Sequence, residues 1–388
     1  MSSSITVRNF RPAGMGVQGY VSGLRSALTV LYGEQSSGRL MDGLVEAAVR
    51  HPFAVPPGWA GRLGGPGSPL WKQCVPDIRE LEAGGESASC DPLAETRYAV
   101  LPGAIQRYQD RLLVFVSDRC AGYCRFCTRR RMVGRTGESR SRETSLSGME
   151  TVPQKAVAVP ADRGAVVAWL RAHPGVRDVL LSGGDPLMLD DDGLEAWVRE
   201  IREARPDILI RIGTRMPSFA PERVSQGLCR RLAAHGPVYV NVHFNHTDEL
   251  TEEARLACRR MNAAGLITGN QTVLLAGVND SVSQLRELFF GLLSCGVRPY
   301  YLHTMDHVGG TAHFRVPLSR AAALWEDLAL TTSGMAVPRM MIDLPGGGGK
   351  IQYMRGMLAE DHGTGRLVFR NVDGGLTPYR DLPDGGPQ

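Results

Sequence analysis

The sequence predicts an α/β fold, an incomplete parallel barrel with an extension at each end. From about residue 110, short apolar runs typical of strands alternate with amphipathic runs typical of helices, and parallel strands require such helical crossovers. Roughly six or seven strand–helix units can be counted, fewer than the eight of a complete barrel. Polar segments follow the predicted strands, where a barrel carries its active site: SDRC, SGGD, NVHFNH, HTMDH and DLPGGGGK.

The elements are expected in the following order. Residues 1–95 combine one plausible helix, SGLRSALTVLYGE, with Gly- and Pro-rich loops, which predicts an N-terminal helical extension. Residues 96–343 hold the partial barrel, with strands at RLLVFVSD, DVLLSGGD, ILIRIGTR, PVYVNVHFN, NQTVLLAG, RPYYLHTMD and PRMMIDL. Residues 344–388 hold a glycine-rich loop and a C-terminal segment. Residues 134–160 are polar and aperiodic, which predicts a surface loop or insertion.

The bulk composition narrows the class of protein. The chain has 388 residues, 44 basic and 40 acidic, a balance that argues against nucleic acid or an anionic membrane as the main partner. No run approaches the ~20 apolar residues of a membrane span, and the N-terminus, MSSSITVRNFRPAG, has no secretory pattern. We therefore expect a cytoplasmic protein whose eight cysteines are reduced thiols.

Three cysteines stand close together directly after the strand RLLVFVSD. Cys120, Cys124 and Cys127 have the spacing C-x3-C-x2-C. A structural zinc site normally takes four protein ligands, often as paired C-x2-C units, and no fourth ligand is evident here. Three thiolates suit a [4Fe-4S] cluster with one iron open to another ligand. Structural zinc and incidental thiols remain the alternatives.

Two glycine-rich turns also follow predicted strands. The turn Ser182-Gly183-Gly184-Asp185 could bring backbone close to a ligand, although an ordinary strand-to-helix turn capped by the aspartate explains it equally. The segment DLPGGGGK, residues 343–350, is not a phosphate-binding P-loop, since position 344 is Leu and position 351 is Ile. Its lysine could form a Schiff base with pyridoxal 5'-phosphate (PLP); a flexible loop with an incidental lysine is the alternative.

The cysteine motif, with an aromatic residue before its last cysteine, resembles that of radical S-adenosylmethionine (SAM) enzymes. From about residue 90 to 379 the chain resembles the lysine 2,3-aminomutase family through DRCAGYCRFCTRRR, DVLLSGGDPL, RIGTR, HFNH, RPYY, HFRVPL, TSG and PGGGGK. The resemblance implies a (β/α)6-type radical SAM barrel with a short C-terminal strand segment. It also implies an isomerase that uses a [4Fe-4S] cluster, SAM and PLP.

The resemblance implies roles for individual residues. The three cysteines would bind the cluster, whose open iron SAM chelates, and residues 182–185 and His243 would lie near SAM. The segment LVFRNVDGGLTPY would close over the SAM adenine. Lys350 would hold PLP, with Arg107, Tyr108 and Arg111 around its phosphate. Arg129 would grip the substrate carboxylate, a task suited to a planar bidentate donor, while Arg130 and Arg131 would be ion-pair partners.

The substrate is expected to be a cationic amino acid. Asp306 and Asp343 match two carboxylates that bind the distal ammonium of lysine, and a buried cation needs such partners. Lysine is therefore expected, and a glutamate enzyme should lack the acidic pair. Arginine is the close alternative, because it presents a larger and flatter cation at the same end. His303 stands where lysine enzymes carry Tyr, so the resemblance does not fix the exact substrate. A radical SAM epimerase or dehydrogenase, and a non-catalytic metal protein, are the other hypotheses.

Partners are implied only in part. The family needs an electron donor such as flavodoxin or ferredoxin. A homo-oligomer is possible, but no cysteine follows Cys295, so the C-terminal cysteine-rich zinc segment that some members use in assembly is absent from this sequence.

Overall fold

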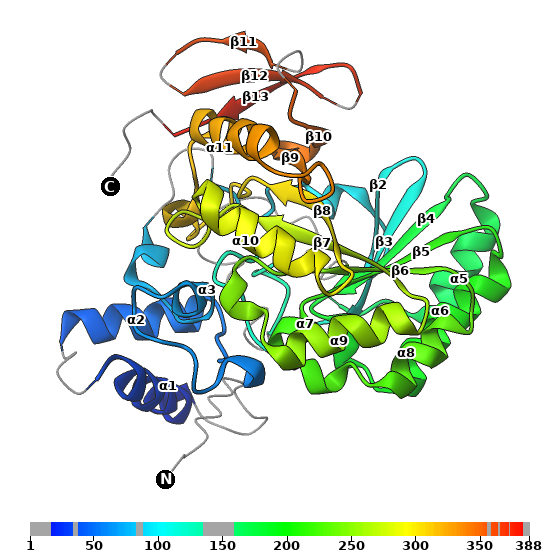
Figure 1. Ribbon diagram of the computed structural model, residues 1–388, viewed down its shortest axis with the longest axis horizontal. Helices are drawn as coiled ribbons and strands as arrows, with labels where there is room; N and C mark the ends of the chain where they lie inside the picture. Colours follow the sequence, from blue (N-terminus) through cyan, green and yellow to red (C-terminus); the bar gives the residue numbers. More distant parts are fainter. Residues whose placement is uncertain are drawn as a thin grey trace.

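An open sheet of ten strands forms the centre of the protein (Figure 1). The structure is a computed structural model and describes residues 17–33, 38–82, 88–134, 159–354, 358–363, 365–371 and 373–382. Most of the insertion predicted at 134–160 lies outside these residues. The strands follow one another in sequence order from β1 to β10, so the sheet has two free edges and does not close. An incomplete barrel was predicted, and the open sheet confirms it.

The middle of the sheet is parallel. Parallel pairings join seven strands in sequence: β3 (Arg111–Ser117), β4 (Asp178–Gly183), β5 (Leu209–Thr214), β6 (Val238–Val242), β7 (Ile267–Val273), β8 (Arg298–His303) and β9 (Arg339–Leu344). Before them, β1 (Ala99–Leu101) and β2 (Ala104–Tyr108) form an antiparallel meander with β3. The strands predicted from residue 110 onward are therefore present, with boundaries shifted by a few residues.

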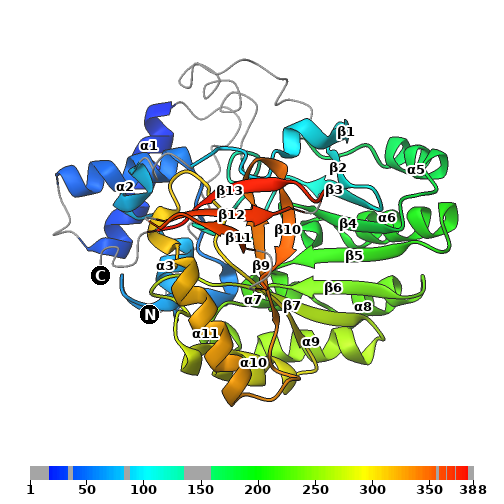
Figure 2. The ribbon, with the colours of Figure 1, turned by 90° about the horizontal axis from the view of Figure 1, so that it is seen from above.

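Helices cover the outer face of the parallel strands, as Figure 2 shows from above. In order they are α5 (Arg163–Ala172), α6 (Asp191–Ala204), the short α7 (Met216–Phe219), α8 (Gln226–Ala233), α9 (Glu252–Ala263), α10 (Val282–Leu293) and α11 (Leu318–Thr331). Most of these helices begin after an N-cap residue whose side chain accepts a hydrogen bond from a backbone N–H of the first helical turn. These N-cap residues include Asp190, Ser225 and Thr251. Their apolar faces and the sheet enclose one large buried core.

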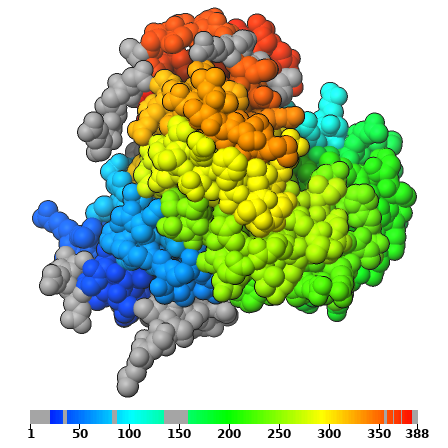
Figure 3. All heavy atoms as spheres, viewed as in Figure 1, coloured from blue at the N-terminus to red at the C-terminus, as the bar shows by residue number. Residues whose placement is uncertain are grey.

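The N-terminal helices lie against the side of the barrel, as the space-filling view shows (Figure 3). They are α1 (Val17–Tyr32), α2 (Arg39–Arg50) and α3 (Pro69–Cys74). Short 3-10 turns connect them to the barrel, among them η2 (Ile78–Leu81). Arg125, in the cysteine loop, is fully buried and forms a two-hydrogen-bond ion pair with Glu80 of η2. Its Nη1 also donates to the carbonyls of His51 and Pro52. The N-terminal extension therefore supports the cysteine loop.

The C-terminal part adds a hairpin and a small sheet. Strand β10 (Gly349–Gln352) pairs antiparallel with β9 across the glycine-rich turn, so the boundary predicted at residue 343 falls inside this hairpin. A three-stranded antiparallel sheet follows, of β11 (Leu358–Asp361), β12 (Arg366–Arg370) and β13 (Leu376–Arg380). The sequence indicated the last two strands only, because β11 is short and largely exposed. None of the helices formed by the described residues is long and apolar enough to span a membrane.

Candidate active site

The three clustered cysteines lie in the loop that leaves the carboxyl end of β3. The loop is partly folded by its own backbone, since the N–H of Cys127 donates to the carbonyl of Cys124 at 3.1 Å. Burial and the charges of neighbouring acidic and thiol groups raise the pKa of Cys120 well above its usual value, and burial first of all raises that of Cys127 to about 12. The thiolates therefore disfavour one another unless a positively charged group lies among them. Among the described residues, no group of three or more His, Cys, Asp or Glu side chains is placed to hold a single metal ion.

The turn at residues 182–185 packs directly against this loop. A Cβ atom on Gly183 or Gly184 would lie 2.3 Å from the carbonyl oxygen of Ser117 or Arg119 respectively, so only glycine fits at either position. Gly183 also has φ 118°, which favours glycine. The N–H of Gly184 donates to Ser117 at 2.7 Å. The glycines thus allow the second strand's turn to lie against the cysteine loop.

Asp185 is buried and its carboxylate is used within the protein. It accepts a hydrogen bond from the N–H of Leu187 and so caps the 3-10 turn that follows. It also accepts hydrogen bonds from the Thr214 hydroxyl and from the N–H of Arg215, at the end of β5. The ordinary capping role considered for this aspartate is therefore present. A role toward SAM stays a prediction for this residue.

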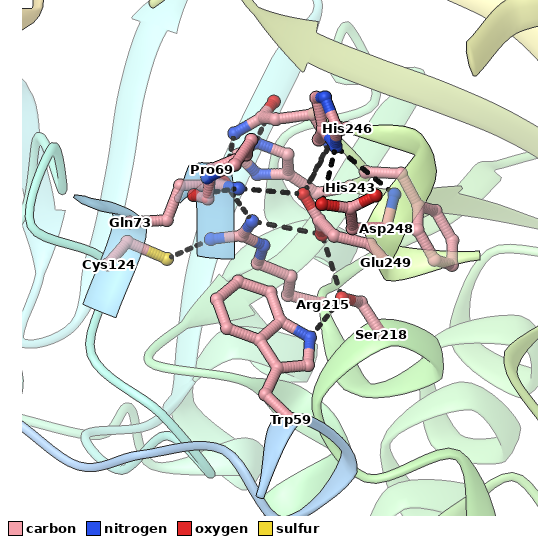
Figure 4. A network of polar contacts seen from close by, with 12 residues as sticks. Trp59, Pro69, Gln73, Cys124, Arg215, Ser218, His243, His246, Asp248 and Glu249 are labelled. Carbon is pink, nitrogen blue, oxygen red and sulfur yellow. Dashed lines mark hydrogen bonds and ion pairs between the residues drawn. The ribbon is translucent and has the colours of Figure 1, made fainter. Parts of the chain in front are cut away.

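A buried polar network lies beside Cys124 and links three parts of the chain (Figure 4). Arg215 donates from Nη1 to the Cys124 sulfur at 2.9 Å and from Nη2 to Glu249 at 3.0 Å. Its Nη2 also donates to Gln73 of α3 at 2.5 Å. Burial lowers the pKa of Arg215, but the Cys124 thiolate and Glu249 more than offset burial and raise it above its usual value. Sequence reasoning missed this network, because Gln73, Arg215 and Glu249 are far apart in the chain.

His243 lies directly after β6 and faces the same region. Its Nε2 is 3.0 Å from Asn245 Oδ1, and its ring centroid is 5.8 Å from that of Phe126, which stands between Cys124 and Cys127. Burial and the nearby Arg215 charge lower the pKa of His243 well below its usual value. The ring is therefore neutral at pH 7 and is placed beside the cysteine loop.

Lys350 and Asp343 face each other across the β9–β10 hairpin. The two residues are partners in the strand register, and their side chains form an ion pair. Lys350 Nζ also lies 3.1 Å from His303 Nδ1 at the end of β8. Burial raises the pKa of Asp343, but Lys350 and His303 outweigh burial and hold it well below its usual range. Burial and the Lys350 charge lower the pKa of His303.

Asp306 joins this group from the loop after β8. Its carboxylate accepts a hydrogen bond from the Thr128 hydroxyl at 2.5 Å. Burial, together with repulsion from Asp343, raises the pKa of Asp306 to about 7. The two predicted carboxylates are thus close enough to affect each other's ionisation, and they lie beside the lysine amine.

The arginines of the cysteine loop have separate partners. Arg129 Nε donates to Glu95 at 2.8 Å, and its guanidinium lies 5.3 Å from the Phe115 ring centroid. Arg130 pairs with Glu80 and Arg131 with Asp91, at 2.7 and 2.9 Å. The expectation of ion pairs for Arg130 and Arg131 is confirmed, whereas the pairing of Arg129 with Glu95 was not foreseen.

Residues of the β2–β3 hairpin reach the glycine-rich turn. The Tyr108 hydroxyl accepts a hydrogen bond from the N–H of Lys350 at 2.7 Å. Arg107 Nε donates to the Gly347 carbonyl at 2.5 Å, and its guanidinium lies 4.7 Å from the Tyr98 ring centroid. Arg111 pairs with Asp110, and its guanidinium lies 4.5 Å from the Tyr108 ring centroid. Arg107 and Tyr108 therefore contact the glycine-rich turn directly and Arg111 contacts Tyr108, and guanidinium and phenol groups of this kind suit a phosphate.

Comparisons with known proteins agree with this architecture. The Radical SAM superfamily model matches residues 114–289, and a model described as Lysine-2,3-aminomutase matches residues 325–385. An L-lysine 2,3-aminomutase of Fusobacterium nucleatum is 39% identical over 314 residues, 81% of this chain and 69% of that protein. One from Acetoanaerobium sticklandii is 39% identical over 320 residues, 82% and 72% of the two chains.

The chain belongs to the lysine 2,3-aminomutase family of radical SAM enzymes. It is therefore an enzyme of an isomerase family, and membership implies an iron–sulfur cluster and SAM. The family also includes a glutamate 2,3-aminomutase of Clostridioides difficile, 35% identical over 316 residues, 81% of this chain and 70% of that protein. The substrate of an individual member consequently depends on its own pocket residues.

Proposed function

We propose that this family member is a PLP-dependent 2,3-aminomutase that moves the α-amino group of a cationic amino acid, L-lysine in the simplest case, to C3. The observation that carries the proposal is the pair of carboxylates, Asp306 and Asp343, beside the Lys350 amine. A partly buried pair of acidic groups is costly without a cation. In the structure this cation is the side-chain ammonium of Lys350. The distal ammonium of the bound substrate would replace it.

The donor sets suit the groups that the reaction requires. A bound [4Fe-4S] cluster would supply the electron that splits SAM into methionine and a 5'-deoxyadenosyl radical, and a bound PLP would carry the migrating nitrogen. Cys120, Cys124 and Cys127 would hold the cluster: burial first, and then neighbouring acidic and thiol groups, raise the pKa of Cys120 and Cys127, and a cationic cluster would offset this cost of ionisation. Lys350 would hold PLP, with Arg107, Tyr108 and Arg111 at its phosphate.

The protein's own residues would bind and orient the other components. Residues 182–185 would offer backbone to the SAM methionine group, with His243 nearby. Arg129 would bind the substrate carboxylate. To do so, its guanidinium would give up its hydrogen bond to Glu95. Such binding would hold the substrate in one orientation beside the SAM site, a positioning effect of the kind worth several orders of magnitude in rate.

The acidic pair selects for the charge of the side chain. A glutamate side chain would meet two carboxylates in a partly buried site and be repelled, whereas lysine and arginine both present a cation. The smaller lysine ammonium suits two converging carboxylates. Arginine remains the second candidate because His303, 3.1 Å from Lys350, offers a planar partner at this end of the pocket.

The test is anaerobic reconstitution of the full chain with iron, sulfide, PLP and SAM, with chemically reduced flavodoxin or ferredoxin as electron donor. Lysine, arginine and glutamate are offered in competition, and products are separated by chromatography. We expect a β-amino acid from lysine or arginine and none from glutamate. If the substrate is converted to a product other than a β-amino acid, and Lys350→Ala loses the PLP absorbance but keeps that conversion, a radical SAM epimerase or dehydrogenase is favoured instead.

A further inference from the structure

Arg215 is a buried side chain that contacts the cysteine loop but has no role in the proposed reaction. It follows β5 directly, and it is 6% exposed. Among the described residues, Cys124 is the one cysteine to which Arg215 donates a hydrogen bond. Figure 4 shows its guanidinium lying between the Cys124 sulfur and the carboxylate of Glu249. A permanent positive charge is therefore held against one of the three proposed cluster ligands.

The position of this charge is strongly restrained. Three aromatic rings surround the guanidinium carbon, with centroids at 4.6 Å for Phe219 and 5.2 Å for both Trp59 and Phe126. Such cation–π contacts are strongest where water is excluded. Glu249 is itself fully buried and accepts hydrogen bonds from the Ser218 hydroxyl and the N–H of Asn245 as well. Neither member of the pair can move away without leaving a buried charge unpaired.

The arrangement has more partners than a simple structural ion pair needs. Gln73, from the N-terminal extension, accepts from Arg215 and from Asn245 and donates to Glu249. The extension thus orients the arginine toward the sulfur, while Arg215 Nε has no hydrogen-bond partner among the described residues. Among the described residues, the contact to sulfur is consequently the one polar contact of the Arg215 side chain that the ion pair and its orienting amide do not explain.

We propose that Arg215 is a positioning residue that raises the reduction potential of the cluster by holding a charged N–H donor on the Cys124 sulfur, and that Glu249 counteracts it. The proposal rests on the proposed function for the presence of the cluster. Reduction adds one electron and makes the cluster more negative, so a donor and a positive charge at a ligand sulfur stabilise the reduced form. Glu249, farther from the sulfur, acts in the opposite direction.

The experiment measures the midpoint potential of the reconstituted cluster in the full chain. Titration uses dithionite as the one-electron reductant and ferricyanide as oxidant, with the reduced cluster followed by electron paramagnetic resonance. In R215Q we expect the reduced-to-oxidised ratio at a fixed potential to fall about tenfold, which equals ~59 mV for a one-electron couple. In R215K, which keeps the positive charge but loses the planar guanidinium with its several N–H donors, this ratio should fall less than in R215Q. E249Q should move the potential upward.

Trp59→Phe is the matched control. It removes the hydrogen bond from Trp59 Nε1 to Ser218 at 3.1 Å within the same network but changes no charge, so the potential should stay at the wild-type value. General loosening of the network would move all variants in one direction. Opposite signs for R215Q and E249Q are therefore the result that a merely structural role cannot produce.

Two results would overturn the proposal: an unchanged potential in R215Q with full iron content, or shifts of the same sign in R215Q and E249Q. Should R215Q take up no iron, R215K decides, and an unchanged potential there also overturns it. Failure of the proposed function looks different. In that case the wild-type protein would bind no cluster or make no β-amino acid. If only the Arg215 proposal fails, the wild-type protein still binds the cluster, and the variants lack the expected shifts in midpoint potential.

Discussion

Substitution of Glu80 by Gln tests whether the N-terminal extension stabilises the cysteine loop. Glu80 accepts from two arginines of that loop, Arg125 at 2.7 and 2.8 Å and Arg130 at 2.7 Å. Burial raises the pKa of Glu80, but the two guanidinium groups outweigh burial and lower it, so the carboxylate is ionised at pH 7. Glutamine has nearly the same shape but removes the charge and points an amide toward one arginine.

The expected loss follows from the burial of the pair. The side chains of Arg125 and Glu80 are 0% and 1% exposed, and breaking such a pair from one side costs ~3–5 kcal/mol. A stability of ~5–15 kcal/mol is typical of folded domains, so the substitution should remove a large share of it. The melting temperature should fall by roughly 10 °C.

The assay is urea and thermal unfolding of the cluster-free protein under reducing conditions, followed by circular dichroism. Asp42→Asn is the matched control, because Asp42 pairs with Arg25 in the same extension but both side chains are exposed, at 66% and 46%. That pair is worth ~0–1 kcal/mol. Equal losses in the two variants, or less than ~1 kcal/mol for Glu80→Gln, would refute the reasoning.

Three predictions concern the reaction. The pKa of Asp306, about 7, keeps this carboxyl largely neutral below pH 7 and ionised above it, so KM for lysine should fall about tenfold between pH 6 and pH 8; Asp306→Asn should raise KM by ~30-fold or more and abolish this pH dependence. A pH-independent KM in the wild type would contradict the assignment. Lys350→Ala should lose both the PLP absorbance after gel filtration and β-amino acid formation, while SAM cleavage by the reduced enzyme in the absence of substrate persists. Arg129→Lys should raise KM about tenfold, because one ammonium cannot make the bidentate contact; an unchanged KM would assign Arg129 to its ion pair with Glu95 alone.

The sequence alone predicted those features that depend on neighbours in the chain. Strands and helices alternate because apolar periodicity and capping side chains are local signals, and the parallel part of the sheet follows from that alternation. The cysteine spacing places three thiols in one loop, and Asp343 and Lys350 meet because a short turn joins two paired strands. Strand β11 was missed, since four largely exposed residues carry little periodic signal.

The tertiary structure decided which distant side chains meet. Glu80 and Arg125 are 45 residues apart, and Gln73 and Arg215 are 142 apart; no local pattern relates them, because each contact depends on how the N-terminal extension packs on the barrel. The same holds for the partner of Arg129. The sequence indicated an arginine beside the cysteines, but only the folded chain shows that Glu95 holds Arg129, and that a different arginine, Arg215, is bonded to the Cys124 sulfur. A buried charge must find its partner in space, and proximity in space is a property of the fold.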